Sequence, residues 1–141
     1  MKKLLFILVA FTAFGCSKRL SMSSSSHQLV GSWQMVSMKY TYPDGRVMER
    51  KDFKYPALKM YNEHAFYSFG RQKNSGEIDD AGGGKYQLVG DTLISIPEYH
   101  TVSSFVGKPT KFHVKFEKDK FYQTGVLLNE IKIEEVYVRL K

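Results

Sequence analysis

The sequence predicts an all-β domain, an antiparallel up-and-down β-barrel of about eight to nine strands. Aromatic residues make up 14% of the 141 residues, and such side chains favour strands, where they pack against neighbouring chains. From residue 29 onward, short alternating segments are separated by turn residues. No long amphipathic helix interrupts them, and a closed barrel removes the exposed edges that an open sheet of this length would leave.

The strands follow from alternation, and their boundaries follow from turn chemistry. Pro43 and Gly45 set the dihedral angles of the first hairpin turn, and Gly90 forms the tip of a later, tighter hairpin. Pro97 lacks an amide proton and ends its strand, so residues 98–108 are expected to be irregular, with one short helical turn at most. The expected strands occupy residues 29–42, 47–53, 57–61, 65–69, 85–89, 92–96, 110–118, 121–125 and 131–140.

Two segments have contrasting patterns. Residues 71–84 are polar and contain four glycines, which predicts a long loop over one end of the sheet. Residues 110–118 alternate cleanly, with Phe112, Val114 and Phe116 on one face of the predicted strand.

The first fifteen residues have the outline of a secretory signal peptide. Lys2 and Lys3 give a basic start, and an uncharged, mostly apolar run follows. That run is shorter than the roughly 20 residues that a membrane-spanning helix needs. Cys16 comes next and is the only cysteine of the chain, which is unusual for an exported protein unless its thiol is consumed.

The ending Ala13-Phe14-Gly15-Cys16 resembles the lipobox of bacterial lipoproteins. The resemblance implies cleavage before Cys16 and acylation of that residue, so that the mature protein reaches the membrane through its lipidated Cys16. A simple secretory peptide with an incidental cysteine is the alternative. Buried acyl chains contribute about 0.8 kcal/mol per methylene, so several chains anchor a protein durably.

Residues 16–28 are polar and have the composition of a lipidated tether, which leaves residues 29–141 for the barrel domain. No acidic run follows Cys16. We therefore expect the protein to be located in the bacterial cell envelope, where its lipid anchors it to the outer membrane and the domain faces the periplasm.

Two short motifs resemble those of lipocalins. Gly31 and Trp33 match the Gly-X-Trp motif of the first lipocalin strand, and Arg139 matches the arginine that packs on that tryptophan. The resemblance implies that these three residues are structural and close the base of the barrel. A guanidinium over an indole contributes about 0.5 to 2 kcal/mol, depending on exposure.

Taken with the lipobox and with the stretches 90–92, 99–108 and 135–139, the chain resembles small lipocalin-like bacterial lipoproteins of unassigned biochemical role. The resemblance covers residues 29–141 and implies a lipocalin-like barrel. A disulfide and a C-terminal helix, both present in typical lipocalins, are not evident here.

A first candidate ligand site lies on the predicted strand 65–69 and just beyond it. Tyr67, Phe69 and Arg71 alternate on one face and form an aromatic wall that ends in a cation. Such a wall suits an apolar ligand with an anionic head, because apolar contact gives affinity and a few polar groups fix orientation. A packed aromatic core is the alternative, since small eight-stranded barrels can be filled by their own side chains.

A second candidate pair is Glu98 and His100. If Ile94 and Ile96 face the interior, alternation carries both titratable groups to the same side, at the barrel mouth. There they could orient a polar ligand or transfer protons. A solvated rim is the alternative.

Other chemistry finds little support. No His-Glu-X-X-His pair, second cysteine or Gly-X-Ser-X-Gly elbow is present, so we predict no metal, no cofactor and no hydrolase. The net charge of +7 falls to +5 without Lys2 and Lys3. The remaining cations are scattered and alternate with apolar residues, so we predict no binding of nucleic acid.

These observations predict a membrane-anchored lipocalin-like lipoprotein that binds a small, partly apolar or amphipathic ligand and is not an enzyme. The alternative is a structural or adaptor lipoprotein of the envelope, with a filled barrel whose outer face binds another protein. An enzyme built on Glu98 and His100 ranks third.

Overall fold

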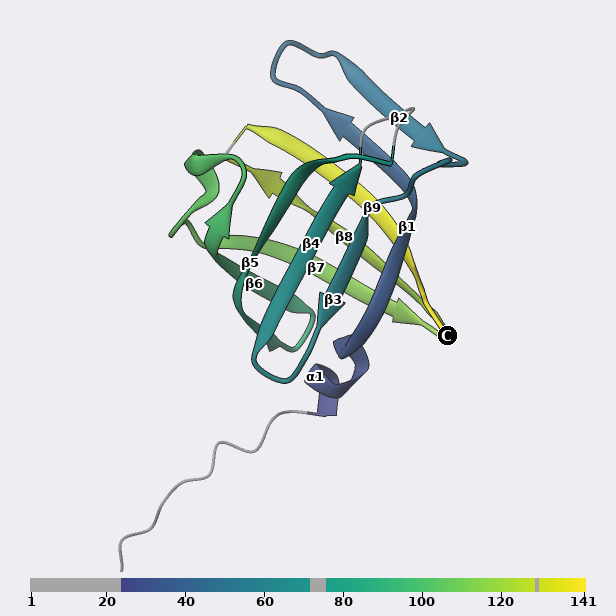
Figure 1. Cartoon of the computed structure of the whole chain (residues 1–141), viewed down its shortest axis with the longest axis vertical. Helices are drawn as coiled ribbons and strands as arrows, with labels where there is room; N and C mark the ends of the chain where they lie inside the picture. Colours follow the sequence, from purple (N-terminus) through teal and green to yellow (C-terminus); the bar gives the residue numbers. More distant parts are fainter. Residues whose placement is uncertain (1–23, 72–75, 129) are drawn as a thin grey trace, which may run out of the picture.

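The computed structural model describes residues 24–71, 76–128 and 130–141, so the predicted signal peptide 1–15 and Cys16 lie outside the described residues. One short helix and a 3-10 turn accompany nine strands (Figure 1). The elements are α1 (Ser24–Leu29), β1 (Gly31–Thr41), β2 (Val47–Lys51), β3 (Leu58–Tyr61), β4 (Ala65–Arg71), β5 (Ile78–Val89), β6 (Thr92–His100), η1 (Ser103–Phe105), β7 (Thr110–Glu117), β8 (Lys120–Leu127) and β9 (Ile131–Arg139).

Eight of the strands close into an antiparallel barrel. The order is β1-β3-β4-β5-β6-β7-β8-β9, and β9 pairs back onto β1 (Figure 1). Closure gives each of these strands two neighbours, which removes the sheet edges. The predicted all-β up-and-down barrel is therefore confirmed, with eight strands in the wall and β2 as an additional ninth.

The additional strand arises because the chain leaves and rejoins the same edge of β1. β2 pairs with residues 37–41 of β1, and β3 pairs with residues 31–34. Between them the chain leaves the sheet, beginning at Asp52, which has a left-handed φ of 61°. The β1–β2 hairpin extends past the barrel wall at the open end (Figure 1).

The prediction of a loop over residues 71–84 is wrong, because residues from Ile78 onward belong to β5. Its glycines pair with both neighbouring strands: Gly82 with Ser68 and His100, and Gly83 with Tyr67 and Tyr99. The His100 ring lies against Gly82 and the Tyr99 ring against Gly83, so a Cβ at either glycine would collide with a ring. The glycine run makes room for aromatic neighbours in a strand.

The clean alternation predicted for residues 110–118 is confirmed. Phe112 and Val114 are buried, whereas Lys111, His113 and Lys115 are exposed. β7 therefore presents apolar side chains to the interior and charged ones to solvent.

The closed half of the barrel is filled by aromatic rings. Trp33, Phe121 and Tyr137 have no exposed surface. The Trp33 ring meets Phe121 edge-on at 4.8 Å, and Phe121 stacks on Tyr137 at 4.6 Å between centroids. The indole N–H of Trp33 donates to the carbonyl of Leu29 at 2.7 Å, which ties α1 to the core. Within the described residues no helix is long and apolar enough to span a membrane.

Arg139 covers the base of the barrel. Its guanidinium lies 4.1 Å from the centroid of the Trp33 ring and donates to the carbonyls of Val30 at 2.6 Å and Gln28 at 2.5 Å. Gly31 has a φ of 134°, and a Cβ there would meet the guanidinium. The three residues singled out by the lipocalin motifs thus lie together in a structural contact at the closed end.

Candidate ligand-binding cavity

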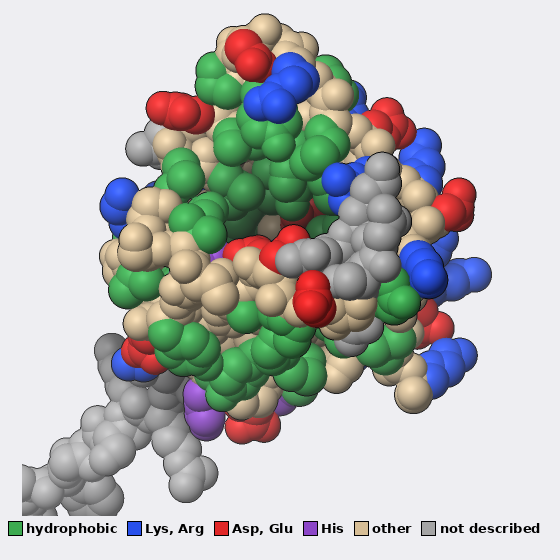
Figure 2. Space-filling view, turned by 45° about the horizontal axis from the view of Figure 1, so that its top comes forward, with side chains coloured by type: hydrophobic (Ala, Val, Ile, Leu, Met, Phe, Trp, Pro, Cys, Tyr) green, Lys and Arg blue, Asp and Glu red, His purple; other side chains and the backbone are tan. Residues whose placement is uncertain are grey.

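The open half of the barrel encloses a cavity of about 670 Å³. Figure 2 shows the hollow at the mouth, with hydrophobic side chains around it and acidic side chains at its edge. Pockets of about 300 to 1,000 Å³ are typical of small-molecule sites. The apolar part of the wall includes Met35, Met38, Phe53, Phe66, Phe112, Leu127 and Ile133.

The cavity exists because small residues occupy lining positions in this half. Ala57, Ser68, Gly70 and Ser95 line it, where bulky side chains would fill it. The closed half has aromatic side chains at the corresponding inward positions. The filled-interior alternative therefore describes only the lower half of the barrel.

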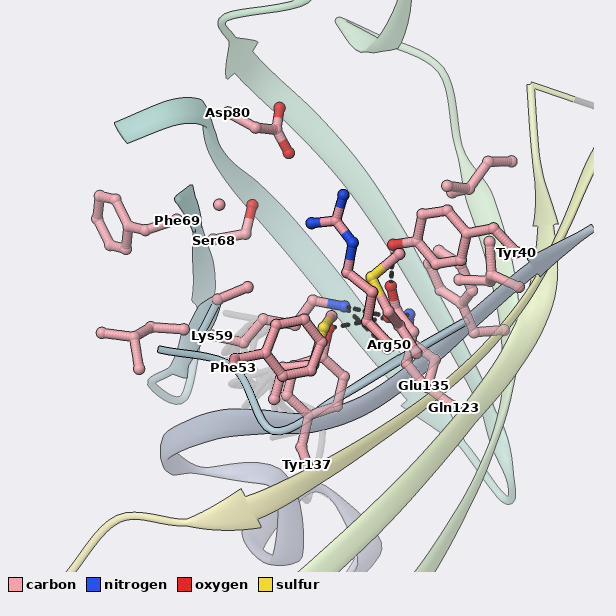
Figure 3. Close-up of a pocket in the computed structure, with 18 of the residues that line it drawn as sticks. Tyr40, Arg50, Phe53, Lys59, Ser68, Phe69, Asp80, Gln123, Glu135 and Tyr137 are labelled. Carbon is pink, nitrogen blue, oxygen red and sulfur yellow. Dashed lines mark hydrogen bonds and ion pairs between the residues drawn. The ribbon is translucent and has the colours of Figure 1, made fainter. Parts of the chain in front are cut away.

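A buried carboxylate forms one wall of the cavity. Glu135 on β9 is 5% exposed and accepts four hydrogen bonds (Figure 3). The donors come from four strands: the Tyr40 hydroxyl at 2.5 Å, the Tyr137 hydroxyl at 2.9 Å, the Gln123 amide at 3.1 Å and the Lys59 ammonium at 3.2 Å. We call these five residues the Glu135 cluster.

The polar groups of the Glu135 cluster find their hydrogen-bond partners within the cluster. Lys59 is held by Glu135, by the Gln123 carbonyl oxygen at 3.3 Å and by the face of the Tyr137 ring at 4.7 Å. In the described part of the chain, no buried side-chain nitrogen or oxygen lacks a hydrogen-bond partner. A buried ion pair persists only with such additional bonds, because each charge has lost its water.

Burial fixes the protonation of the two tyrosines. Burial, followed by the negative charge of Glu135, raises the pKa of Tyr40 far above its usual range. The same causes, in the same order, raise the pKa of Tyr137. Both hydroxyls therefore stay protonated and donate to the carboxylate throughout the physiological range.

Arg50 on β2 also faces the cavity. It is half-buried, pairs in register with Met38, and points its guanidinium into the hollow (Figure 3). In the described part of the chain it makes no hydrogen bond or ion pair. The sequence analysis missed it, although the alternation of Met48 and Arg50 in a predicted strand was the signal that could have found it.

His100 lines the cavity, as predicted for the mouth. Its side chain is 10% exposed, and its Nδ1 accepts the backbone N–H of Val102 at 3.0 Å. The Nε2 atom lies 3.6 Å from an Asp80 oxygen, and the ring packs on Phe105 at 4.7 Å. Both ring nitrogens are therefore engaged by the protein.

Glu98 does not join His100, so the prediction that they share a face is wrong. Glu98 is exposed on the outer surface and pairs with Lys85 at 3.2 Å. Two differences explain this result. Ser95 and Pro97 face inward, in place of the isoleucines, and a bulge in the β5–β6 pairing leaves Glu98 without a partner. The extra residue of a bulge reverses the alternation that follows it, which returns His100 to the interior.

The prediction that Tyr67 and Phe69 form an aromatic wall of the site on β4 is wrong. Phe66 and Ser68 face the cavity, and Tyr67 lies on the outer face. Phe69 contributes to the rim, with its ring turned away from the hollow in Figure 3. The Arg71 side chain lies outside the described part of the chain. A shift of one residue moves every side chain of a strand to the opposite face.

The described residues bring together no group of three His, Cys, Asp or Glu side chains arranged to hold a metal ion.

The architecture is that of a lipocalin-like β-barrel. A redesigned β-barrel is similar, with a TM-score of 0.55 and 17% identity over 86% of this chain and 99% of that one. A lipocalin-like protein from Bacteroides uniformis has a TM-score of 0.50 and 16% identity over 79% and 98% of the two chains. An uncharacterized protein from Bacteroides eggerthii has a TM-score of 0.50 and 18% identity, over 79% and 99%. At these identities the likeness establishes the fold. No family model and no curated protein matches the chain.

Proposed function

We propose that this protein is a membrane-anchored lipocalin-like lipoprotein whose barrel binds a small, partly apolar ligand without catalysis. The open cavity of about 670 Å³ is the observation that carries the proposal. Its apolar walls supply affinity through burial, and a few polar groups at fixed positions set orientation.

The way the polar groups are used supports binding over catalysis. The Glu135 carboxylate already accepts four hydrogen bonds from the protein, three at Oε2 and one at Oε1, so a substrate would compete with these donors, and each ring nitrogen of His100 faces a protein group. A general base needs a free lone pair within reach of the substrate proton. These groups act as a fixed polar surface for the ligand.

Anchoring through Cys16 completes the proposal. The helix α1 begins at Ser24, eight residues after Cys16. An extended chain spans at most about 3.6 Å per residue, so the tether would hold the barrel within roughly 30 Å of the bilayer. We place the anchor in the outer membrane, with the barrel facing the periplasm. Mass spectrometry of the membrane fraction should find the acylated Cys16 as first residue, and Cys16→Ser should release the protein.

Ligand binding is tested with the mature chain, residues 16–141 carrying Cys16→Ser, and the neutral apolar dye N-phenyl-1-naphthylamine. Fluorescence titration should show saturable binding to one site. Ser68→Trp should abolish it by filling the cavity, whereas Met60→Trp, on the outer face of the neighbouring strand, should leave it unchanged. Dye binding that does not saturate, or that survives Ser68→Trp, would contradict the proposal. Native mass spectrometry of the same protein then searches for small molecules retained from the host.

An adaptor that binds an envelope protein is the second candidate. The observation that favours it is an apolar outer face across β3 to β6, where Met60, Ile96 and Tyr99 are 37%, 38% and 53% exposed. Exposed apolar patches of this kind mark interaction surfaces. A stoichiometric partner recovered by cross-linking and lost on Tyr99→Glu would support this function.

A further inference from the structure

We infer that the cavity selects amphiphiles with a single negative charge, and that Arg50 pairs with their anionic head group. The inference rests on the proposed ligand-binding function and specifies the chemical class of the ligand.

The charges inside the cavity do not cancel. Apart from tyrosines, the ionisable lining residues that are buried or half-buried are Arg50, Lys59, His100 and Glu135. Lys59 and Glu135 neutralise each other at 3.2 Å. His100 accepts the backbone N–H of Val102 at Nδ1, and its Nε2 lies 3.6 Å from an Asp80 oxygen. The positive charge of Arg50 is left over.

Four exposed carboxylates line the mouth, those of Glu49, Asp52, Asp79 and Asp80, and none of them forms an ion pair with Arg50. Asp80, which lies beyond the Arg50 guanidinium in Figure 3, is within 3.6 Å of His100 and accepts from the Thr101 hydroxyl at 3.3 Å. Its side chain is 53% exposed. Glu49 pairs with Lys51 at 2.9 Å, and both side chains are more than half exposed. Arg50 remains without an ion pair in the described part of the chain.

An anion bound by Arg50 would lie beside the apolar wall of the cavity. Arg50 is in register with Met38, and Met38 is in register with Glu135, so the three side chains form one row across β2, β1 and β9. Neighbouring strands are about 4.8 Å apart. A head group on Arg50 thus lies over Met38, and an attached chain can extend along Ile133 and Leu127.

When a ligand fills the cavity, its affinity depends on the charge of its head group. In the empty barrel, water solvates the Arg50 guanidinium. An apolar ligand displaces that water, and a desolvated, unpaired cation is strongly unfavourable. A carboxylate or similar anion removes this cost, because a guanidinium binds it through two parallel hydrogen bonds. A neutral ligand of the same shape leaves the guanidinium unpaired.

The test compares decanoate with decan-1-ol, which share an apolar chain and differ in charge. Isothermal titration calorimetry below the micellar concentration uses the mature chain with Cys16→Ser, alone and with Arg50→Gln. Arg46→Gln is the matched control, because Arg46 belongs to the same hairpin, is 68% exposed and pairs with Asp44. Thermal unfolding confirms that each variant is folded.

We expect the parent protein to bind decanoate about tenfold or more tightly than decan-1-ol, the ratio expected of one charge-assisted pair. Arg50→Gln should erase that ratio by weakening decanoate alone, and Arg46→Gln should retain it. Equal binding of decanoate before and after Arg50→Gln would overturn the inference, and so would a preference of the parent protein for decan-1-ol. If the neutral dye saturates in either case, the proposed function stands. If the dye does not bind, both fall together.

Discussion

The closed end and the open half of the barrel are built from the same strands but filled by different chemistry. In one layer, Met35, Tyr137 and Phe121 lie side by side on β1, β9 and β8. In the next layer towards the mouth, the same strands contribute Met38, Glu135 and Gln123, listed in the same order.

A step of two residues along β8 and β9, and of three along β1, where the pairing has a bulge, thus replaces the stacked rings of Phe121 and Tyr137 with a hydrogen-bonded carboxylate. The lower layer mainly serves stability: Phe121 lies off the cavity, whereas Met35 and Tyr137 also form part of its lining. The upper layer combines the demands of stability and recognition. Its polar groups must be paired within the protein and still present a surface to a ligand.

The largest expected loss of unfolding free energy comes from a substitution at the closed end. Trp33→Ala removes a fully buried indole and its contacts with Phe121 and Arg139. We expect a loss of about 4 kcal/mol in the free energy of unfolding, as for other large-to-small changes at buried aromatic positions. Urea denaturation measures it, with Met60→Ala on the outer surface as the control. A cost for Trp33→Ala no greater than that of the control would show that the base does not anchor the fold.

A somewhat smaller loss of unfolding free energy is expected from a substitution in the Glu135 cluster of the open half. Glu135→Leu leaves the Lys59 ammonium without its carboxylate, which should cost about 3 kcal/mol of unfolding free energy. Adding Lys59→Met should recover the part of that loss that comes from the unpaired ammonium, whereas the Tyr40, Gln123 and Tyr137 donors stay without the carboxylate. Chemical denaturation of both single variants and of the double variant gives the coupling energy. Additive effects of the two changes would mean that the ion pair is not energetically coupled.

The smallest expected effect, counted per residue, is a pH dependence that spans both layers. Burial is the largest cause that raises the pKa of Tyr40, Tyr61 and Tyr137 in the folded state. Below pH 10 these tyrosines are protonated in both states, and their contribution to stability is complete. Above pH 10 only the unfolded chain ionises them. The free energy of unfolding should then fall by about 1.4 kcal/mol per pH unit for each tyrosine.

Urea denaturation between pH 9 and pH 11 measures this slope. Tyr61→Phe should reduce it by the share of one tyrosine, and it leaves the hydrogen bonds of the Glu135 cluster in place. An unchanged slope in that variant would contradict the assignment of the effect to the buried rings.

Sequence reasoning recovered the fold where alternation runs without a bulge. On β7 it placed Phe112 and Val114 inside, because nothing shifts the register between them. On β6 it failed at Glu98, because a bulge is set by the pairing with β5 and not by the local sequence. The glycines of β5 suggested a loop, since the rings of Tyr99 and His100 that occupy their space lie farther along the chain.

The candidate site was harder to predict for a related reason. Lys59 and Glu135 are separated by 76 residues. Taken alone, each is a charged residue of the kind expected at a solvent-facing position of a strand. Only the closed topology brings β3 and β9 onto the two sides of β1 and turns both side chains inward. A polar residue at an inward position can be recognised from the sequence only when its distant partner is known.

The contacts of Arg139 have a mechanical consequence. Its guanidinium donates hydrogen bonds to the carbonyls of Gln28 and Val30. These bonds tie the end of β9 to the chain just before β1. Tension arriving through α1 is therefore shared between two strands that are neighbours in the sheet. A pull along β1 loads its ladder with β9 in shear, with many hydrogen bonds strained at once, because those bonds lie across the strand direction.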